Sequence, residues 1–344
     1  MTSKTEDTPT LKILTYNIFM RFAGCSAPSI GDCKNRRLDL FAKHVLPMYD
    51  VVCLQEMFGA PTFLTMGRRN FLIKHAKKCG FKYILTSSYP RFWRGNFLDG
   101  GLVMLSKIPF EETNKIEYDD CMVQDALAAK GVLHALLKTS SGDLLHVFTT
   151  HLQAAYYFPS SNDEADVQIK QLQQFSKFIK DVVDNSSQPK APILVLGDFN
   201  IDVFQDEMNS LYSDMLKLFD SIYDHKFRDL IRESYGGKSI PTTVPYLFDK
   251  QTGHEHVLGS NIETETGPRL PSTTFMKDNI SRFALRPMAL DYALLCDRGH
   301  KNLQIMRTRV NEFRTQNLIL EPKLDFPFFY LSDHFGVCID MKFT

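Results

Sequence analysis

Short apolar runs, rich in β-branched and aromatic side chains, recur along the chain and predict β-strands. Between them, two segments place apolar residues at intervals of three and four, which is typical of amphipathic helices. One helix is expected within Ala165–Asp184 and another near Asn35–His44, where Pro47 ends the pattern. The predicted strands are Leu11–Ile18, Val51–Leu54, Gly101–Leu105, Leu144–Thr150, Ile193–Leu196, Ala289–Leu295 and Phe335–Ile339.

Strands and helices are mixed along the whole chain, without a repeat and without a Pro-, Gly- or Ser-rich linker. This organisation favours a single α/β domain, which we expect to span residues 11–344. The polar residues 1–10 are expected to form a disordered N-terminal segment. Residues 232–284 are rich in Gly, Ser, Thr, Pro and charge, and we expect them to form an irregular loop excursion.

The composition excludes several classes of protein. Of the 344 residues, 44% are hydrophobic and 12% aromatic, so we do not expect a disordered chain, a collagen or a coiled coil. Forty basic residues balance forty acidic ones. Proteins that bind nucleic acid through counterion release usually carry a clear basic excess, so strong nucleic-acid binding is not expected.

The sequence also indicates a location. No apolar window approaches the roughly 18 residues that span a bilayer, and the polar N-terminus lacks the apolar core of a secretory signal. Seven scattered cysteines without a CxxC pair argue against a disulfide framework and a structural zinc site. These features favour a reducing compartment, so we expect a cytoplasmic protein or one that is peripheral on a membrane surface.

Polar residues that could carry chemistry lie at the ends of the apolar runs. If the strand ends face one way, these carboxylates, amides and imidazoles form a single polar cluster. The six segments are Tyr16-Asn17, Gln55-Glu56, Thr150-His151-Leu152-Gln153, Gly197-Asp198-Phe199-Asn200, Leu290-Asp291-Tyr292 and Ser332-Asp333-His334.

This set of side chains suits a hard cation such as Mg²⁺, which prefers oxygen ligands and also binds phosphate oxygens. The two histidines titrate near neutral pH and can act as a base or a donor. A metal with histidines and carboxylates, without a candidate covalent nucleophile, indicates attack of water on a phosphoric ester. The spacing alone leaves open whether the substrate is a phosphodiester or a phosphomonoester.

In their chain order, the six segments resemble the magnesium-dependent endonuclease/exonuclease/phosphatase superfamily, whose type member is pancreatic deoxyribonuclease. Within it, the sequence is most similar to the neutral sphingomyelinases. That similarity lies in the segments Asp99-Gly100-Gly101, Ser106-Lys107-Ile108-Pro109, Lys130-Gly131 and His151-Leu152-Gln153-Ala154. The chain departs from the family at Ala129, where an Asn is usual, and at Met57-Phe58-Gly59 after Glu56. We expect these departures to affect lipid preference more than hydrolytic chemistry.

The resemblance implies a fold and a reaction. The implied fold is a four-layer α/β/β/α sandwich, in which helices flank two mixed β-sheets as in DNase I. The implied enzyme is a Mg²⁺-dependent phosphodiesterase of the phospholipase C type, with Mn²⁺ or Co²⁺ able to substitute. It would hydrolyse sphingomyelin, or a related phospho-sphingolipid, to ceramide and phosphocholine.

The resemblance also implies roles for individual residues. Glu56 is the expected principal metal ligand, with Asn17 near the metal or the phosphate and Asp333 on metal-bound water. His334 is the expected general base, and Asp291 orients its ring. Asp198 and Asn200 are expected to position the attacking water and the phosphoryl group, and His151 to donate a hydrogen bond to a phosphate oxygen. Lys130 is expected to add positive charge near the phosphate, and Asp99 to orient groups around the metal.

Asp198 and Asn200 alternate at a predicted strand end, so we expect their side chains to share a face. A lipid phosphodiesterase must also reach a bond at the bilayer surface. Trp93, Tyr156 and Tyr157 are candidate membrane contacts, because aromatic side chains on loops can anchor in the headgroup layer. Without a long basic amphipathic helix, we expect transient, peripheral contact with a phospholipid surface.

Other functions stay open on sequence grounds. A phosphoinositide phosphatase or a nuclease could share the fold, and a catalytically inactive binding module is a third alternative. The inositol 5-phosphatases carry Trp before their Gly-Asp-x-Asn segment, where this chain has Leu196. Neutral net charge argues weakly against a nuclease, and intact Glu56, Asp198 and His334 argue against a binding module.

Overall fold

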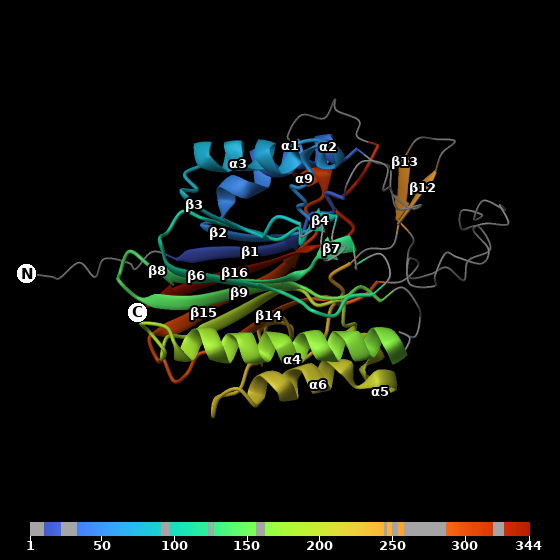
Figure 1. Cartoon of the computed structure of the whole chain (residues 1–344). Coiled ribbons are helices and arrows are strands. Elements are labelled where there is room, and N and C mark those ends of the chain that lie inside the picture. The colour runs from blue at the N-terminus through green and yellow to red at the C-terminus, as the bar shows by residue number, and fades with distance from the viewer. Residues whose placement is uncertain are drawn as a thin grey trace, which may run out of the picture.

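Two six-stranded β-sheets lie face to face at the centre of the structure, and helices cover the outer face of each (Figure 1). The structure is a computed structural model, and it describes residues 10–21, 33–90, 97–122, 125, 127–155, 162–243, 246–249, 254–257, 287–318 and 327–344. This arrangement confirms the expected four-layer α/β/β/α sandwich.

Both sheets are mixed. The first has the strand order β15-β16-β1-β2-β5-β3, with β1 and β2 parallel. Its strands are β1 (Leu11–Asn17), β2 (Val51–Gln55), β3 (Tyr83–Thr86), β5 (Val103–Ser106), β15 (Leu303–Asn311) and β16 (Gly336–Phe343). The second has the order β11-β14-β10-β9-β8-β6, with β9 and β10 parallel. Its strands are β6 (Phe110–Glu117), β8 (Gly131–Lys138), β9 (Leu144–His151), β10 (Ile193–Asp198), β11 (Arg228–Asp229) and β14 (Asp291–Cys296).

Helices complete the outer layers. On the first sheet lie α1 (Lys34–Leu40), which continues into η1 (Phe41–Val45) and η2 (Leu46–Met48), and α3 (Arg68–Lys78). On the second lie α4 (Asn162–Asp184) and α6 (Leu211–Asp220). The shorter elements are α2 (Thr62–Thr65), η5 (Val203–Gln205), α5 (Asp206–Asn209), α7 (Leu230–Ser234), α9 (Thr315–Leu318) and two small sheets, β4 (Leu98–Asp99) with β7 (Ala128–Ala129) and β12 (Tyr246–Asp249) with β13 (His254–Val257).

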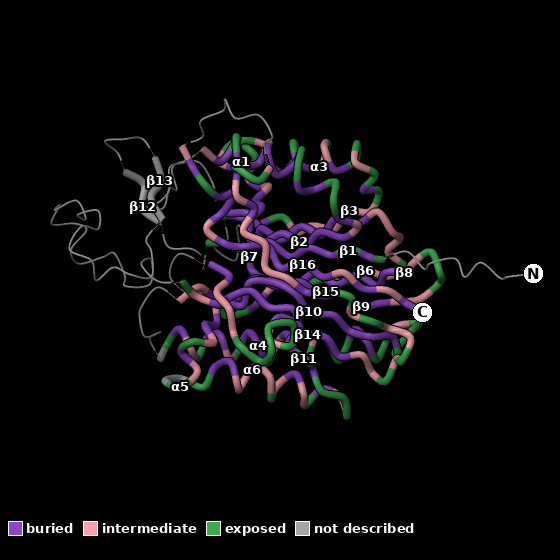
Figure 2. Tube along the Cα trace, turned by 180° about the vertical axis from the view of Figure 1, so that it is seen from behind, coloured by how far each residue is buried: buried purple, intermediate pink, exposed green. Residues whose placement is uncertain are grey.

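Side-chain alternation along each central strand fills three apolar layers. On β1, Ile13 packs between the two sheets, whereas Leu14 and Tyr16 pack toward α1 and α3. Both faces of such a strand are buried, which explains why the strand sequences are nearly continuous apolar runs. Figure 2 shows this distribution of burial, with buried residues along the sheets and exposed residues on the outer faces of the helices.

The predicted strands are all present, and each begins within two residues of its expected start. The two predicted helices correspond to α4 and to α1 with its continuation to Met48. The sequence analysis did not single out β6, β8, β15, α3 or α6. No helix in the described ranges is long and apolar enough to cross a bilayer.

The domain limits stay predictions. Apart from Thr10, the expected N-terminal segment lies outside the described residues. Within the expected excursion 232–284, the structure describes the end of α7, residues 235–243 and the pair β12–β13. The remaining residues of that excursion lie outside the described ranges.

Two buried histidines form a hydrogen-bonded pair between β8 and β9. Nε2 of His134 lies 2.9 Å from Nδ1 of His146, and Nε2 of His146 lies 3.1 Å from the carbonyl oxygen of Gln188. The side-chain amide of Asn114 lies 3.3 Å from Nδ1 of His134. This chain of bonds is satisfied when both rings are neutral and protonated on Nε2. Burial lowers the pKa of both rings, that of His134 well below its usual value.

We therefore expect acid to destabilise the fold through this pair. The unfolded histidines bind protons near pH 6.5 but the folded ones only at lower pH, so their contribution is complete above about 6.5 and is lost as the pH falls. Below about pH 6.5, each ring should lower the free energy of unfolding by up to ~1.4 kcal/mol for each unit by which the pH falls. Urea unfolding between pH 7.5 and 5 should show a smaller pH slope in His134→Gln/His146→Gln than in the wild type. His300→Gln, at a half-buried position, is the matched control, and equal slopes in all three proteins would contradict the expectation.

Candidate active site

The carboxyl ends of β1, β2, β9 and β10 carry the predicted site residues. On the second sheet, Asp198 of β10 pairs with His151 of β9 on one side and with Asp291 of β14 on the other. On the first sheet, Asn17 pairs with Gln55, and Glu56 follows directly. Strand register thus places residues from five separate segments at one end of the sandwich.

Asn17 connects the two sheets at this end. Its fully buried Nδ2 donates to Oδ2 of Asp198 at 2.9 Å and to Oε1 of Glu56 at 3.3 Å. Its Oδ1 accepts a hydrogen bond from the backbone N–H of Phe19 at 3.1 Å, which fixes the orientation of the amide. One amide therefore holds a carboxylate of each sheet at a defined separation.

Gln55 makes a second connection between the sheets. Its Nε2 donates to the hydroxyl of Thr15 at 3.0 Å and to that of Thr149, on the opposite sheet, at 3.1 Å. The hydroxyl of Ser332 donates to the backbone carbonyl of Asn17 at 2.7 Å and so attaches the loop before β16 to the end of β1.

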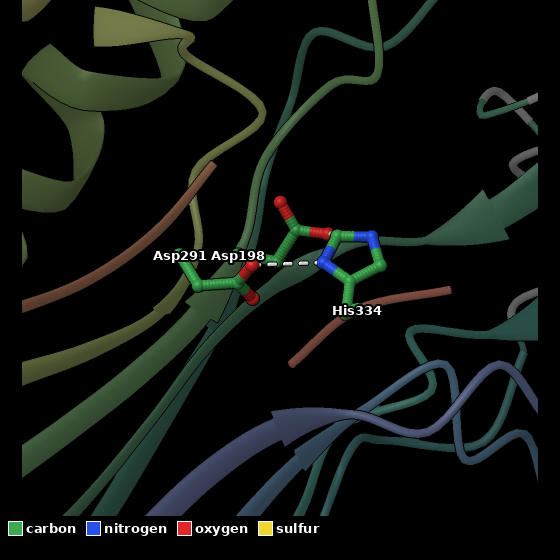
Figure 3. A group of neighbouring side chains, drawn as sticks. All are labelled: Asp198, Asp291 and His334. Carbon is green, nitrogen blue, oxygen red and sulfur yellow. Dashed lines mark hydrogen bonds and ion pairs between the residues drawn. The ribbon is translucent and has the colours of Figure 1, made fainter. Parts of the chain in front are cut away.

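His334 and Asp291 form a buried pair (Figure 3). Nδ1 of His334 lies 2.8 Å from Oδ2 of Asp291, and the hydroxyl of Thr242 donates to the same oxygen at 2.7 Å. Nε2 of His334 lies 3.6 Å from Oδ2 of Asp198. A carboxylate on one ring nitrogen fixes the tautomer and leaves the other nitrogen available to accept a proton, as a general base requires.

Burial and neighbouring charges shift the pKa values of these groups. Burial lowers the pKa of His334, but the carboxylates of Asp291 and Asp198 outweigh it and raise the pKa well above its usual value. Burial raises the pKa of Asp198 to about 7, with His334 opposing and Asp291 adding to the shift. Burial also acts to raise the pKa of Glu56, but the Arg21 guanidinium outweighs it and holds that pKa below its usual value.

Lys130 and His151 lie beside Asp198. Nζ of Lys130 donates to Oδ2 of Asp125 at 2.8 Å and to the carbonyl of Leu152 at 2.7 Å, and it lies 3.3 Å from Nε2 of His151. That same Nε2 lies 3.5 Å from Oδ2 of Asp198. Burial, and next the charge of Lys130, lower the pKa of His151, so the ring is neutral at pH 7. Its Nδ1 is buried and has no hydrogen-bond partner among the described residues.

The predicted strand alternation of Asp198 and Asn200 is wrong. β10 ends at Asp198, and Asn200 has a left-handed backbone with φ 53°, a conformation that Asn adopts more readily than most residues. Its N–H donates to Oδ1 of Asp198 at 2.9 Å, and its Nδ2 donates to the carbonyl of Leu152 at 3.0 Å. Gly197 has φ 138°, and a Cβ there would lie 2.2 Å from the carbonyl oxygen of Thr150. The turn after β10, rather than strand alternation, places Asn200.

Asp99 supports the turn that follows Glu56. It is buried, forms an ion pair with Arg69 and accepts hydrogen bonds from the backbone N–H groups of Gly59 at 3.2 Å and Gly101 at 3.1 Å. The carbonyl of Gly101 in turn accepts from the N–H of Met57 at 2.8 Å, one residue after Glu56. These hydrogen bonds are compatible with a role in which Asp99 orients the backbone next to Glu56.

Three contacts that sequence reasoning missed complete the site. Arg21 donates to both carboxylate oxygens of Glu56. The hydroxyl of Thr242 donates to Asp291, and Asp125 accepts a hydrogen bond from Lys130. Arg21 lies four residues after Asn17, a local signal that could have found it, whereas Thr242 and Asp125 lie in segments without a motif. The predicted membrane contacts Trp93, Tyr156 and Tyr157 lie outside the described residues.

The side chains present fit a divalent cation that prefers oxygen ligands. Ligand atoms of Asp198, Asp291 and His334 lie within 4.8 Å of one another, and Oδ1 of Asp291 is buried without a partner among the described residues. Glu56 lies beside this group, where its Oε1 accepts a hydrogen bond from Nδ2 of Asn17, which also donates to Asp198. Asp333 is half-buried in the same loop as His334, and burial raises its pKa.

Carboxylates that could hold a divalent cation lie beside a buried histidine–aspartate pair on a two-sheet sandwich, an arrangement typical of hydrolases of phosphoric esters. The chain belongs to the endonuclease/exonuclease/phosphatase family, whose model matches residues 14–334.

Relatives with similar sequences are sphingomyelinases. A sphingomyelinase of Dictyostelium discoideum is 29% identical over 353 residues, which cover 86% of this chain and 72% of that protein. A sphingomyelinase C of Bacillus cereus is 29% identical over 232 residues, which cover 62% of this chain and 65% of that protein. The resemblance inferred from the sequence motifs is therefore confirmed.

Solved structures share the fold. The beta toxin of Staphylococcus aureus superposes with a TM-score of 0.63 at 20% identity, covering 96% of this chain and 99% of the toxin. A variant of that toxin with bound magnesium ions has a TM-score of 0.60 at 18% identity, covering 98% of this chain and all of that one. Danio rerio TDP2, complexed with a single-stranded DNA product, has a TM-score of 0.57 at 16% identity, covering 97% and 99% of the two chains. At these identities the likeness establishes the fold alone.

The contact between Asp291 and His334 gives a testable prediction. Asp291→Asn should lower the pKa of His334, because it removes the carboxylate bonded to Nδ1 while keeping a side chain that Thr242 can contact. Titration of His334 by NMR in EDTA measures this pKa. Thr242→Val, which leaves the carboxylate in place, should have a smaller effect. An unchanged His334 pKa in Asp291→Asn would show that the carboxylate of Asp291 does not raise the pKa of His334.

Proposed function

We propose that this protein is a Mg²⁺-dependent phosphodiesterase of the phospholipase C type. Its substrate would be sphingomyelin, or a related phospho-sphingolipid, and its products ceramide and phosphocholine. The observation that carries the proposal is the buried His334–Asp291 pair, which faces Asp198 next to Asn17 and Glu56. The sequence relatives named above supply the substrate class.

Glu56 and Asn17 would hold the cation, with Asp333 contacting it through water. When bound, Mg²⁺ would stabilise the negative charge that builds on the phosphate and on the leaving alkoxide. The choice of ion rests on oxygen ligands without cysteine and on the magnesium-bound toxin variant of the same fold. Mn²⁺ or Co²⁺ would be able to substitute.

His334 would take the proton from the attacking water. Its Nε2 faces Asp198 at 3.6 Å, so a water that hydrogen-bonds to Oδ2 of Asp198 lies within reach of the imidazole nitrogen. The imidazolium that forms has Asp291 on Nδ1 and Asp198 near Nε2. Both carboxylates stabilise the charged ring, and this lowers the free energy of the state in which the proton has moved.

His151 would donate a hydrogen bond to a phosphate oxygen as charge develops there. Its neutral ring and its buried Nδ1, which has no hydrogen-bond partner among the described residues, support this role. Lys130 is 2% exposed and lies against the same ring, so it would add positive charge near the phosphate. Asn200 shares the Leu152 carbonyl with Lys130 and would position the phosphoryl group.

The substrate bond lies at a membrane surface, so peripheral and transient contact with a phospholipid layer belongs to the proposal. Trp93, Tyr156 and Tyr157 are the proposed contacts. The protein would be cytoplasmic or peripheral on a membrane surface, and strong nucleic-acid binding is not expected from forty basic and forty acidic residues.

Purified protein should release phosphocholine from sphingomyelin vesicles in the presence of Mg²⁺, and EDTA should abolish the release. His334→Ala and Glu56→Gln should each lower kcat by about 10³-fold or more, because they remove the base and the cation ligand. Matched controls are His300→Ala and Glu233→Gln, whose side chains lie at the surface away from the site. Cleavage of plasmid DNA without activity on vesicles would show that the nuclease alternative is correct.

Serine replacement of Trp93, Tyr156 and Tyr157 together should weaken vesicle binding by roughly tenfold or more, because interfacial aromatic rings anchor proteins in the headgroup layer. Co-sedimentation with sphingomyelin vesicles measures the binding. Hydrolysis of a water-soluble choline phosphodiester should be retained, since the residues at the strand ends are unchanged. Loss of the soluble activity with unchanged sedimentation would contradict a membrane role.

A further inference from the structure

Arg21 occupies both oxygens of the proposed metal ligand. Its Nε donates to Oε2 of Glu56 at 2.7 Å, and its Nη2 donates to Oε1 at 3.2 Å. The carboxylate is almost completely buried, with 7% of its side chain exposed, whereas 40% of the Arg21 side chain is exposed. A two-point contact of this kind is among the stronger ion pairs that proteins form.

The backbone holds Arg21 in this place. After β1 ends, the N–H groups of Ile18 and Met20 donate to the carbonyls of Gln55 and Glu56, each at 3.1 Å. The carbonyl of Arg21 accepts a hydrogen bond from Nη1 of Arg68 at 3.1 Å. The start of the Arg21 side chain is therefore fixed beside Glu56.

The Arg21 side chain is the more exposed member of this ion pair. It lies over the ring of Phe19, with Cζ 4.6 Å from the ring centroid, at the exposed side of the site. Displacing the guanidinium breaks its hydrogen bonds to Glu56 and its contact with Phe19 but does not require the backbone anchors to move. Arg21 thus combines a fixed position along the chain with a head group that can be displaced.

A divalent cation on Glu56 needs at least one of the oxygens that Arg21 now contacts. A guanidinium and a metal ion on one buried carboxylate would also repel each other at a distance where screening by water is weak. The two cations therefore compete for this carboxylate.

We propose that Arg21 is an internal competitor for the metal site, which lowers the affinity of Glu56 for Mg²⁺ and leaves the carboxylate when the ion binds. This inference rests on the proposed function only in taking Glu56 as the metal ligand. Its consequence is that Mg²⁺ binding and release of Arg21 are one coupled event.

Calorimetric titration of the EDTA-treated, dialysed full chain with MgCl₂ tests the competition. Arg21→Gln should bind Mg²⁺ roughly tenfold to a hundredfold more tightly than the wild type, the factor expected when a charged, hydrogen-bonded competitor is removed. Arg21→Lys, which keeps the charge but not the two-point contact, should fall between them. Arg309→Gln is the matched control, because it removes the same charge from a half-buried pair with Asp340 on the first sheet, and it should leave the affinity unchanged.

A spectroscopic readout follows the contact itself. The Arg21 Nε–Hε resonance, assigned by its absence in Arg21→Gln, should move on Mg²⁺ addition toward the position of a free arginine side chain. Equal or weaker Mg²⁺ binding by a folded Arg21→Gln, absence of binding by every variant, or an unmoved Nε–Hε resonance at saturating Mg²⁺ would each overturn the proposal. None of these measurements uses lipid hydrolysis, so an inactive wild type that still shows the competition would refute the proposed function alone.

Discussion

The site depends on one buried amide. Asn17 donates to Glu56 on its own sheet and to Asp198 on the other, and no other described contact joins these two carboxylates directly. Two buried carboxylates placed close together would repel each other unless donors lie between them. The amide supplies both hydrogen bonds at once. The separation between Glu56, the proposed cation ligand, and Asp198, beside the proposed base, is therefore set where the two sheets meet.

Around that amide the carboxylates have different environments and hence different chemistry. Arg21 keeps Glu56 ionised, and burial raises the pKa of Asp198 to about 7. An ionised carboxylate suits a cation ligand, whereas a group that titrates near neutral pH suits proton and water positioning. Asp291 is committed to His334 by its hydrogen bond. Residue types alone do not assign these roles, because they follow from which partner each oxygen finds.

The sequence predicted those parts of the site that follow from the positions of strand ends and from their order along the chain. Apolar runs predicted the central strands except β8, and parallel pairing then brings His151 and Asp198 together. It was less informative where a contact joins unrelated segments, as Thr242 does with Asp291. Edge strands were missed for a related reason: β6 and β15 expose alternate polar residues and present no apolar run. Asn200 was misplaced because a turn with a left-handed residue looks like strand alternation in the sequence.

The fold alone does not select the substrate: TDP2 of Danio rerio, which shares it, was solved with a single-stranded DNA product, whereas sequence relatives of this chain are sphingomyelinases. Selection must come from the surroundings of the site. The turn after Glu56 carries Phe58, which packs with Leu98, Ala128 and Leu64 in a small apolar cluster. Next to that cluster in the chain, Phe63 is 77% and Phe97 56% exposed. Large exposed apolar side chains beside the turn after Glu56 are compatible with the proposed contact with a lipid surface.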